Sequence, residues 1–157
     1  MEKDGAKMKK LTLSDQELEL IIDGEKFAVS LYEGAKKTCE AILKVLPLEA
    51  PLHHGIFSGE IVFFGHDDLP NVEREGWPYF RDKLSQGDVW CPALPNVLGR
   101  FMVIAYGRAS CMRGYQGEYP GNAFGVVKPE HLARMEEVGQ EVFLKGPKKI
   151  VVRKRTK

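Results

Sequence analysis

The chain has 157 residues, of which 43% are hydrophobic and 29% are charged, and its formal net charge is +1. This length and composition are typical of one globular domain, and the near balance of acids and bases argues against a surface built to bind nucleic acid. No apolar run approaches the roughly 20 residues that span a bilayer, and no secretory signal is recognisable, so we expect a cytoplasmic protein without a membrane segment.

The two ends of the chain differ in composition from its middle. The first ten residues are mostly charged or small, and the last residues are mostly basic. We therefore expect a flexible leader over residues 1–14, one domain over residues 15–153 and a basic tail over residues 154–157. Basic residues can attract nucleic acid, but a cluster without interleaved aromatic residues more often forms a solvated tail, so nucleic acid is not an expected partner.

The first part of the domain predicts a hairpin followed by a helix. The alternation Glu-Leu-Glu-Leu over residues 17–20 is typical of a half-buried strand, and residues 27–31 alternate in the same way. Between them, Asp23-Gly24 is the signature of a type I′ turn. A helix that ends before Pro47 is predicted from one apolar stripe. The stripe consists of Ala35, Cys39, Ile42, Leu43 and Leu46.

A second hairpin and a long loop are expected next. Residues 53–57 and 60–64 are apolar enough to form two strands around Ser58-Gly59. The polar stretch 65–86 predicts a long loop, in which one turn of helix is conceivable at residues 71–74. Loops of this length in a compact domain are usually functional or carry short structure of their own.

The most hydrophobic strand of the chain lies in its second half. Strands are expected over residues 89–91 and 98–106, and apolar residues on both faces of the second indicate that both faces are covered. Residues 107–122 predict another extended loop. A short strand over residues 123–127 then leads to a helix with Pro129 at its first position.

That helix is predicted to end at Gly139 and to be followed by a last hairpin, formed by residues 141–145 and 149–153. The sequence therefore predicts about eight strands and two helices without a βαβ rhythm. Antiparallel closure removes the free edges of such a set of strands. We expect a mainly β protein, a closed or nearly closed barrel whose ends are covered by the two helices.

Four stretches, in this order, resemble the cyclophilin fold, and more specifically the small cyclophilin-like proteins of bacteria and archaea whose function is unassigned. They are Thr38-Cys39-Glu40-Ala41-Ile42-Leu43-Lys44-Val45-Leu46-Pro47, Gly59-Glu60-Ile61-Val62-Phe63-Phe64, Gly87-Asp88-Val89 and Ala105-Tyr106-Gly107-Arg108. The similarity extends from Glu17 to Arg153. It implies an eight-stranded barrel closed by helices.

The resemblance also bears on catalysis, because true cyclophilins are prolyl isomerases. Their catalytic arginine follows Phe-His on the strand after the first helix, and a Phe-Met-x-Gln element comes next. Here His53 matches the motif histidine, His54 stands where the arginine would be, and no Phe-Met-x-Gln follows. A histidine is mostly neutral at pH 7, unlike an arginine. We expect a barrel without the isomerase machinery; the alternative is an isomerase with altered catalytic residues.

Other motifs do not predict a metal or cofactor site. His53 and His54 are neighbours on a strand and point to opposite faces, so they cannot bind one metal together. Residues 66–68, His-Asp-Asp, have ligand-type side chains, but adjacent acids in a turn more often cap backbone donors. The three cysteines form no CxxC pair, and we expect Cys39 and Cys91 to be buried and Cys111 to be the exposed thiol. No catalytic residue and no cofactor is predicted.

The aromatic residues of the two long loops favour a binding site. Tryptophan and tyrosine in loops commonly line pockets, since one end is apolar and the other forms hydrogen bonds. We expect a cleft between the loops and the strand end at Trp90 that binds a small molecule or peptide, with Arg108 and His54 orienting an anionic or carbonyl group. The predicted ligand-binding residues are His54, Glu60, Phe64, Trp77, Trp90, Tyr106 and Arg108.

Overall fold

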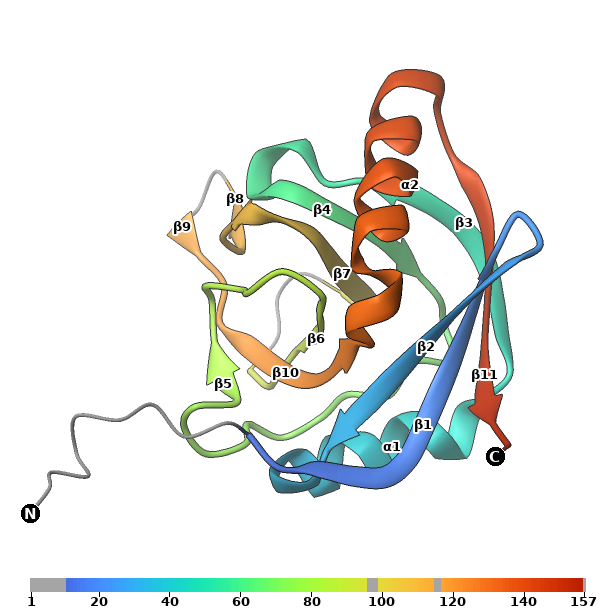
Figure 1. Cartoon of the computed structure of the whole chain (residues 1–157). Helices are drawn as coiled ribbons and strands as arrows, with labels where there is room; N and C mark the ends of the chain where they lie inside the picture. Colours follow the sequence, from blue (N-terminus) through green and yellow to red (C-terminus); the bar gives the residue numbers. More distant parts are fainter. Residues whose placement is uncertain (1–10, 96–98, 115–116, 157) are drawn as a thin grey trace, which may run out of the picture.

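The computed structural model describes residues 11–95, 99–114 and 117–156 and shows an antiparallel β-barrel with one helix at each end (Figure 1). Eight strands form the barrel in the order β2-β1-β11-β3-β4-β7-β6-β10, and pairing of β10 with β2 closes it. Their bounds are β1 Leu13–Ile22, β2 Glu25–Tyr32, β3 Leu48–His54, β4 Gly59–Gly65, β6 Asp88–Pro92, β7 Phe101–Ser110, β10 Gly121–Val127 and β11 Lys148–Arg155. The predicted mainly β closed barrel is confirmed.

The remaining elements are short, apart from two helices. Helix α1 (Lys36–Val45) lies at the lower edge of the molecule in Figure 1, and α2 (Leu132–Lys145) runs from the centre of the view to its top. Strand β5 (Phe80–Arg81) pairs with β10, and β8 (Arg113–Gly114) pairs with β9 (Gly117–Glu118). Single turns of 3₁₀ helix occupy Glu33–Ala35, Ile56–Ser58 and Pro129–His131. Neither helix has the length and apolar character that crossing a bilayer requires.

Both predicted N-terminal features are confirmed. Ile22 pairs with Glu25 across the β1–β2 turn, and Asp23 and Gly24 both have positive φ, 48° and 87°. These backbone angles are those of a type I′ turn, which matches the twist of the two strands. Helix α1 buries Thr38, Cys39 and Ile42, so the predicted apolar stripe faces the barrel.

Strand β7 is covered on both faces, as its sequence predicts. Met102, Ile104 and Tyr106 belong to the main core inside the barrel. Phe101, Val103 and Ala105 belong to a second apolar cluster on the outer face, together with Ile61 of β4 and Trp90 of β6. This second core exists because two loops fold over the outer face. Residue 98, which the sequence placed in this strand, lies outside the described residues.

The cover over the outer cluster consists of Leu84 and Met112, one from each long loop. The two loops are joined by backbone hydrogen bonds, from Leu84 N to Ser110 O at 3.2 Å and from Met112 N to Asp82 O at 2.7 Å. Both side chains are almost fully buried. The loops therefore meet over the strand face and fill it, so no cleft opens between them at Trp90.

The structure differs from the sequence prediction in two segments. Residues 71–74 contain no turn of helix; Val72 instead forms an isolated bridge with Ala93. Helix α2 continues through Gly139 to Lys145 and ends at Gly146, whose φ is 103°, so the predicted strand at 141–145 is wrong. A positive φ of this size is a conformation that glycine adopts without the steric cost of a side chain.

Three boundaries differ by smaller amounts. Strand β11 extends to Arg155, into the expected tail, and β1 begins at Leu13, within the expected leader. The second hairpin is confirmed by the pairs His53–Phe63 and His54–Val62, but its first strand begins earlier, at Leu48, and ends at His54.

Gly139 has a packing role in the middle of α2. A Cβ atom at this position would lie 2.2 Å from the ring of Tyr106, so only a glycine allows the helix to approach β7 this closely. We predict that Gly139→Ala lowers the free energy of unfolding, because overpacking costs about 1–3 kcal/mol while the gain in helix propensity is at most about 1 kcal/mol. Chemical denaturation measures the change.

The control is Gln140→Ala, one residue further along the same helix and exposed. This variant should change the free energy of unfolding by less than about 0.5 kcal/mol. Equal or greater stability of Gly139→Ala would show that α2 does not pack against Tyr106 as described.

Candidate functional site

The predicted site residues do not form one cluster. Phe64 lies in the main core and Trp90 in the outer cluster, and neither side chain has exposed surface. Trp90 also donates a hydrogen bond from Nε1 to Arg81 O at 2.9 Å. Trp77 is 87% exposed in the loop before β5. Phe64 and Trp90 are thus parts of the barrel wall and do not line a cleft, which corrects their predicted placement.

The other four predicted residues lie together at the end of the barrel that α2 covers. His54 ends β3, Glu60 begins β4, and Tyr106 and Arg108 belong to the last part of β7. These strands are neighbours in the barrel, in the order β3-β4-β7. Tyr106 packs against α2 and belongs to the main core, while Arg108, two residues further along β7, is exposed.

His54 is held between Tyr106 and α2. Its Nε2 atom lies 2.7 Å from the hydroxyl of Tyr106, and its ring centroid is 4.9 Å from that of Phe143. Among the described residues, Nδ1 is buried without a hydrogen-bond partner. Burial lowers the pKa of His54 below its ordinary value of 6.5, although the charge of Glu60 opposes this shift. The imidazole is therefore neutral at pH 7.

His53 has the opposite orientation, as the sequence predicts for adjacent residues of a strand. It is exposed, and its ring lies 5.9 Å from that of Phe63 on the outer face of the barrel. Within the described ranges, no three His, Cys, Asp or Glu side chains gather as metal ligands would. His66 Nδ1 instead accepts a hydrogen bond from Asp68 N at 3.0 Å, a local turn contact.

The buried, neutral state of His54 makes stability depend on pH. The unfolded chain takes up a proton near pH 6.5, whereas the folded chain does so only at lower pH. We therefore predict that the contribution of His54 to the free energy of unfolding is complete above pH 6.5. This contribution is lost as the pH falls from 6.5 through the lowered pKa. Denaturant unfolding at a series of pH values measures this slope.

His54→Gln should flatten the slope in this range, whereas His53→Gln, at the exposed neighbour, should leave it unchanged. Three other titratable groups lie nearby: Glu60 acts on both His54 and Tyr106, and Glu136 acts on Tyr106. Burial raises the pKa of Tyr106, so its hydroxyl stays protonated throughout this pH range. An undiminished slope in His54→Gln would assign the pH dependence to another group.

Strand β7 bulges where it passes Glu60. Gly59 pairs with Ser110 and Ile61 pairs with Ala105, so Glu60 alone faces residues 106–109. The Glu60 carboxylate accepts a hydrogen bond from Ala109 N at 3.0 Å, and its backbone carbonyl accepts one from Ser110 Oγ at 3.1 Å. A Cβ atom at residue 107 would lie 2.4 Å from Glu60 Oε1, so Gly107 gives the carboxylate room. Bulges of this kind re-aim side chains beside functional sites.

A groove of about 530 Å³ follows the bulge, and we call it the Arg108 groove. Arg108 and Lys83 are exposed there, and within the described chain neither forms an ion pair. The groove is lined by Ser58, Gly59, Lys83, Leu84, Arg108, Ala109, Ser110 and Cys111. Arg108 belongs to the predicted set; Lys83 does not, and no local pattern marks it, since it reaches the groove by bridging to Cys111 across the two long loops.

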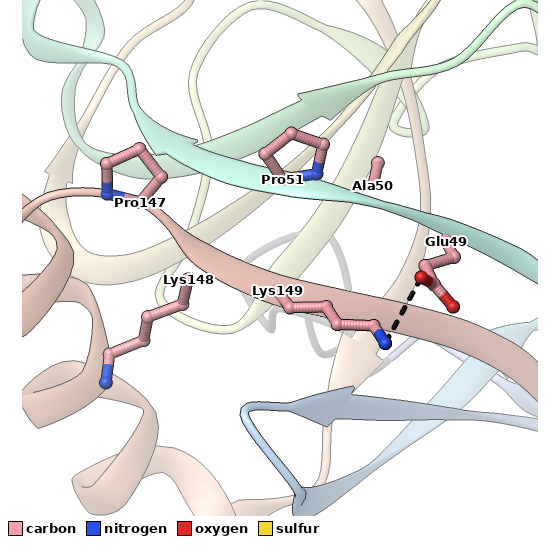
Figure 2. A pocket seen from close by; sticks show the side chains of 6 residues that line it. All are labelled: Glu49, Ala50, Pro51, Pro147, Lys148 and Lys149. Atoms are coloured by element: carbon pink, nitrogen blue, oxygen red, sulfur yellow. Dashed lines mark ion pairs between the residues drawn. The ribbon is translucent and has the colours of Figure 1, made fainter.

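A second groove, of about 420 Å³, crosses β3 and β11 (Figure 2). Pro51, Ala50 and Pro147 give it an apolar surface, but its cations are already neutralised. Lys149 Nζ lies 3.1 Å from Glu49, and Lys148 Nζ lies 3.0 Å from Glu141. The charges at this groove are thus satisfied within the protein.

Two arginines near the C-terminus are also paired. Arg153 contacts Glu19, and Arg155 contacts Glu17, both across the β1–β11 ladder. Lys128 also contacts Glu17, at 2.8 Å. Up to Arg155 the expected solvated tail is therefore part of a strand, in which Arg153 and Arg155 contact carboxylates while Lys154 is exposed. Cys39 and Cys91 are buried, as predicted, while Cys111 is only partly exposed.

The barrel closed by β10 and β2, with its two helices, has a cyclophilin-like fold. The chain matches the model of the family described as "Protein of unknown function (DUF3830)" over residues 20–153, and it belongs to that family. No curated protein matches it.

Solved structures resemble the chain in fold. The structure of McbB in complex with tryptophan shares 17% identity with a TM-score of 0.63, covering 89% of this chain and 45% of McbB, so this chain spans about half of that protein. The hypothetical protein AF2241 from Archaeoglobus fulgidus shares 16%, with a TM-score of 0.57 and coverage of 90% and 96%. A Cryptosporidium parvum cyclophilin type peptidyl-prolyl cis-trans isomerase, in the presence of the dipeptide Ala-Pro, shares 15%, with a TM-score of 0.53 and coverage of 90% and 100%.

Proposed function

We propose that this protein binds a small molecule or peptide in the Arg108 groove and does not isomerise prolyl bonds. The observation that carries the proposal is the groove itself, which follows the β7 bulge and is lined by both Arg108 and Lys83. Its walls come from the ends of β4 and β7, which the barrel ladder holds, and from a loop fixed by backbone hydrogen bonds. Such a pre-formed site binds without a large ordering cost.

The side chains of the groove are better suited to binding a ligand than to catalysing a reaction. Ser110 Oγ donates to backbone carbonyls of Glu60 and Gly107, at 3.1 and 3.4 Å, and no histidine lines the groove to act as its base. A serine nucleophile needs an adjacent general base to be activated. These contacts favour a binding protein over a hydrolase.

Two features support the absence of isomerase activity. Strand β3 has no arginine, and His54 at the corresponding position is neutral and packed beneath α2. The outer face of β4 and β7 is covered by Leu84 and Met112, so a peptide would have to displace both loops to reach it. A fixed cation and an open strand face, which the isomerase reaction would need here, are both missing from the described residues.

The binding site can be located by NMR titration. Tryptophan and the dipeptide Ala-Pro, the molecules present with two proteins of this fold, are suitable probes. We predict that at least one shifts the amide resonances of Gly59, Ala109 and Ser110, and that Arg108→Gln weakens this binding about tenfold, the value of one charge-assisted hydrogen bond. Lys44→Gln, at an exposed lysine of α1, is the matched control.

Shifts confined to other surfaces, for example the groove of Figure 2, would contradict the proposed site. The same conclusion would follow if Arg108→Gln and Lys44→Gln bound the probes equally well. Both substitutions remove an exposed charge and keep the barrel core intact, so a difference between them reports on the groove.

A prolyl isomerisation assay tests the second half of the proposal. With a proline peptide as substrate, we predict no acceleration over the uncatalysed reaction, which takes tens to hundreds of seconds at 25 °C. A concentration-dependent acceleration by the purified protein, lost in His53→Gln or His54→Gln, would instead support an isomerase with altered catalytic residues.

A further inference from the structure

We infer that the Arg108 groove recognises an anionic group, a carboxylate or a phosphate, held between Arg108 and Lys83. The inference rests on the proposed function and names the chemical class of its ligand. It depends on the composition of the groove, on the contrast with cations that have carboxylate partners and on the hydrogen bonds already made by the groove's own backbone.

The composition of the groove distinguishes it from three others on the described surface. The groove of Figure 2 contains Glu49, another contains Glu33 and Glu40, and a third contains Glu73, each beside one or more basic residues. The Arg108 groove has two basic residues and no carboxylate in its lining. A groove of this composition has a positive potential that attracts anions.

Several partly buried cations elsewhere in the described chain have carboxylate partners. Arg134 contacts Glu25, Glu137 and Glu141, with distances of 2.9, 3.3 and 3.0 Å. Arg81 contacts Asp88 at 2.7 Å. Arg108 and Lys83 instead line one groove without an ion pair among the described residues, and an anion bound there could contact both positive charges.

Several backbone donors of the groove are already used. Ala109 N donates to the Glu60 carboxylate and Cys111 N donates to Ser58 O at 3.0 Å each. Ser110 Oγ also donates, to Glu60 O and Gly107 O. An anion would therefore depend on the two side chains, with the arginine offering a planar fork and the lysine a mobile point charge.

Glu60 keeps Arg108 in place without entering the groove lining. Its carboxylate lies under the bulge, beside Gly107 and bonded to Ala109 N, so residues 107–109 are fixed on the side away from the ligand. Its negative charge also offsets part of the surplus positive charge. The groove is thereby suited to one anionic group and not to an extended polyanion such as nucleic acid.

The test compares N-acetyl-Ala-Pro with its C-terminal amide, and both with inorganic phosphate, by NMR titration of the full chain. We expect the free acid or phosphate to shift the groove amides and the amide to bind at least about tenfold more weakly. Arg108→Gln and Lys83→Gln should each weaken binding of the anion about tenfold, whereas Lys44→Gln should not. Binding should also weaken in about 1 M NaCl, where the Debye length is about 3 Å.

The outcomes separate the two proposals. Anion recognition would be overturned if the free acid and the amide bound the groove with equal affinity and Lys83→Gln weakened neither. The proposed binding function would still hold in that case. Shifts from phosphate with none from the free acid would support the inference with phosphate as the source. If neither tryptophan nor any of these probes perturbs the groove amides, both the binding function and the anion inference fail.

Discussion

The buried carboxylate of Asp88 fixes the long loop on which the groove depends. Asp88 is 1% exposed; its Oδ1 accepts from the Tyr32 hydroxyl at 3.2 Å, and its Oδ2 accepts from Arg81 and from Ser85 N, both at 2.7 Å. Burial raises the pKa of Asp88, while Arg81 and the two hydrogen-bond donors oppose that shift. A buried charge is tolerated only when it is paired and bonded in this way. Lys83 and Leu84 lie between Arg81 and Ser85, so the Asp88 carboxylate fixes the segment that carries them. Lys83 lines the groove, and Leu84 covers the outer cluster.

The earlier part of the same loop has a second buried anchor. Glu75 accepts hydrogen bonds from Thr38 N and Thr38 Oγ1, at 2.9 and 2.8 Å, and Glu75 N donates to Asn122 Oδ1 at 3.0 Å. The loop is thus joined to α1 and β10 by side-chain bonds that span the sequence. Satisfied polar networks of this kind fix a unique arrangement without regular secondary structure. This explains how a stretch with little helix or strand becomes part of a rigid site.

Local sequence patterns predicted most of the barrel but not the site. The Asp23-Gly24 turn and the two apolar faces of β7 follow from rules that act over a few residues, and both are confirmed. Gly139 misled the prediction because a glycine in a helix can mark either its end or a close contact, and only the approach of Tyr106 decides between them. The predicted cleft at Trp90 is wrong because Leu84 and Met112 pack over this residue. Nothing in the sequence reveals that these two side chains, from different loops, meet there. Lys83 could not be found at all, since its neighbours in the groove are far away along the chain.

The bulge in β7 explains how one strand serves both the core and the groove. Up to Tyr106 the strand is part of the barrel, where the tyrosine hydroxyl meets His54 beneath α2. Beyond Gly107 the strand is displaced by Glu60, and Arg108 is presented to solvent. Substitutions at exposed positions such as 83 and 108 have small effects on stability, whereas those at Glu60 or Gly107 would disturb the ladder itself. Proteins of this fold can therefore change what the groove recognises through its exposed side chains while the bulge and the barrel stay the same, which is why the fold alone does not identify the ligand.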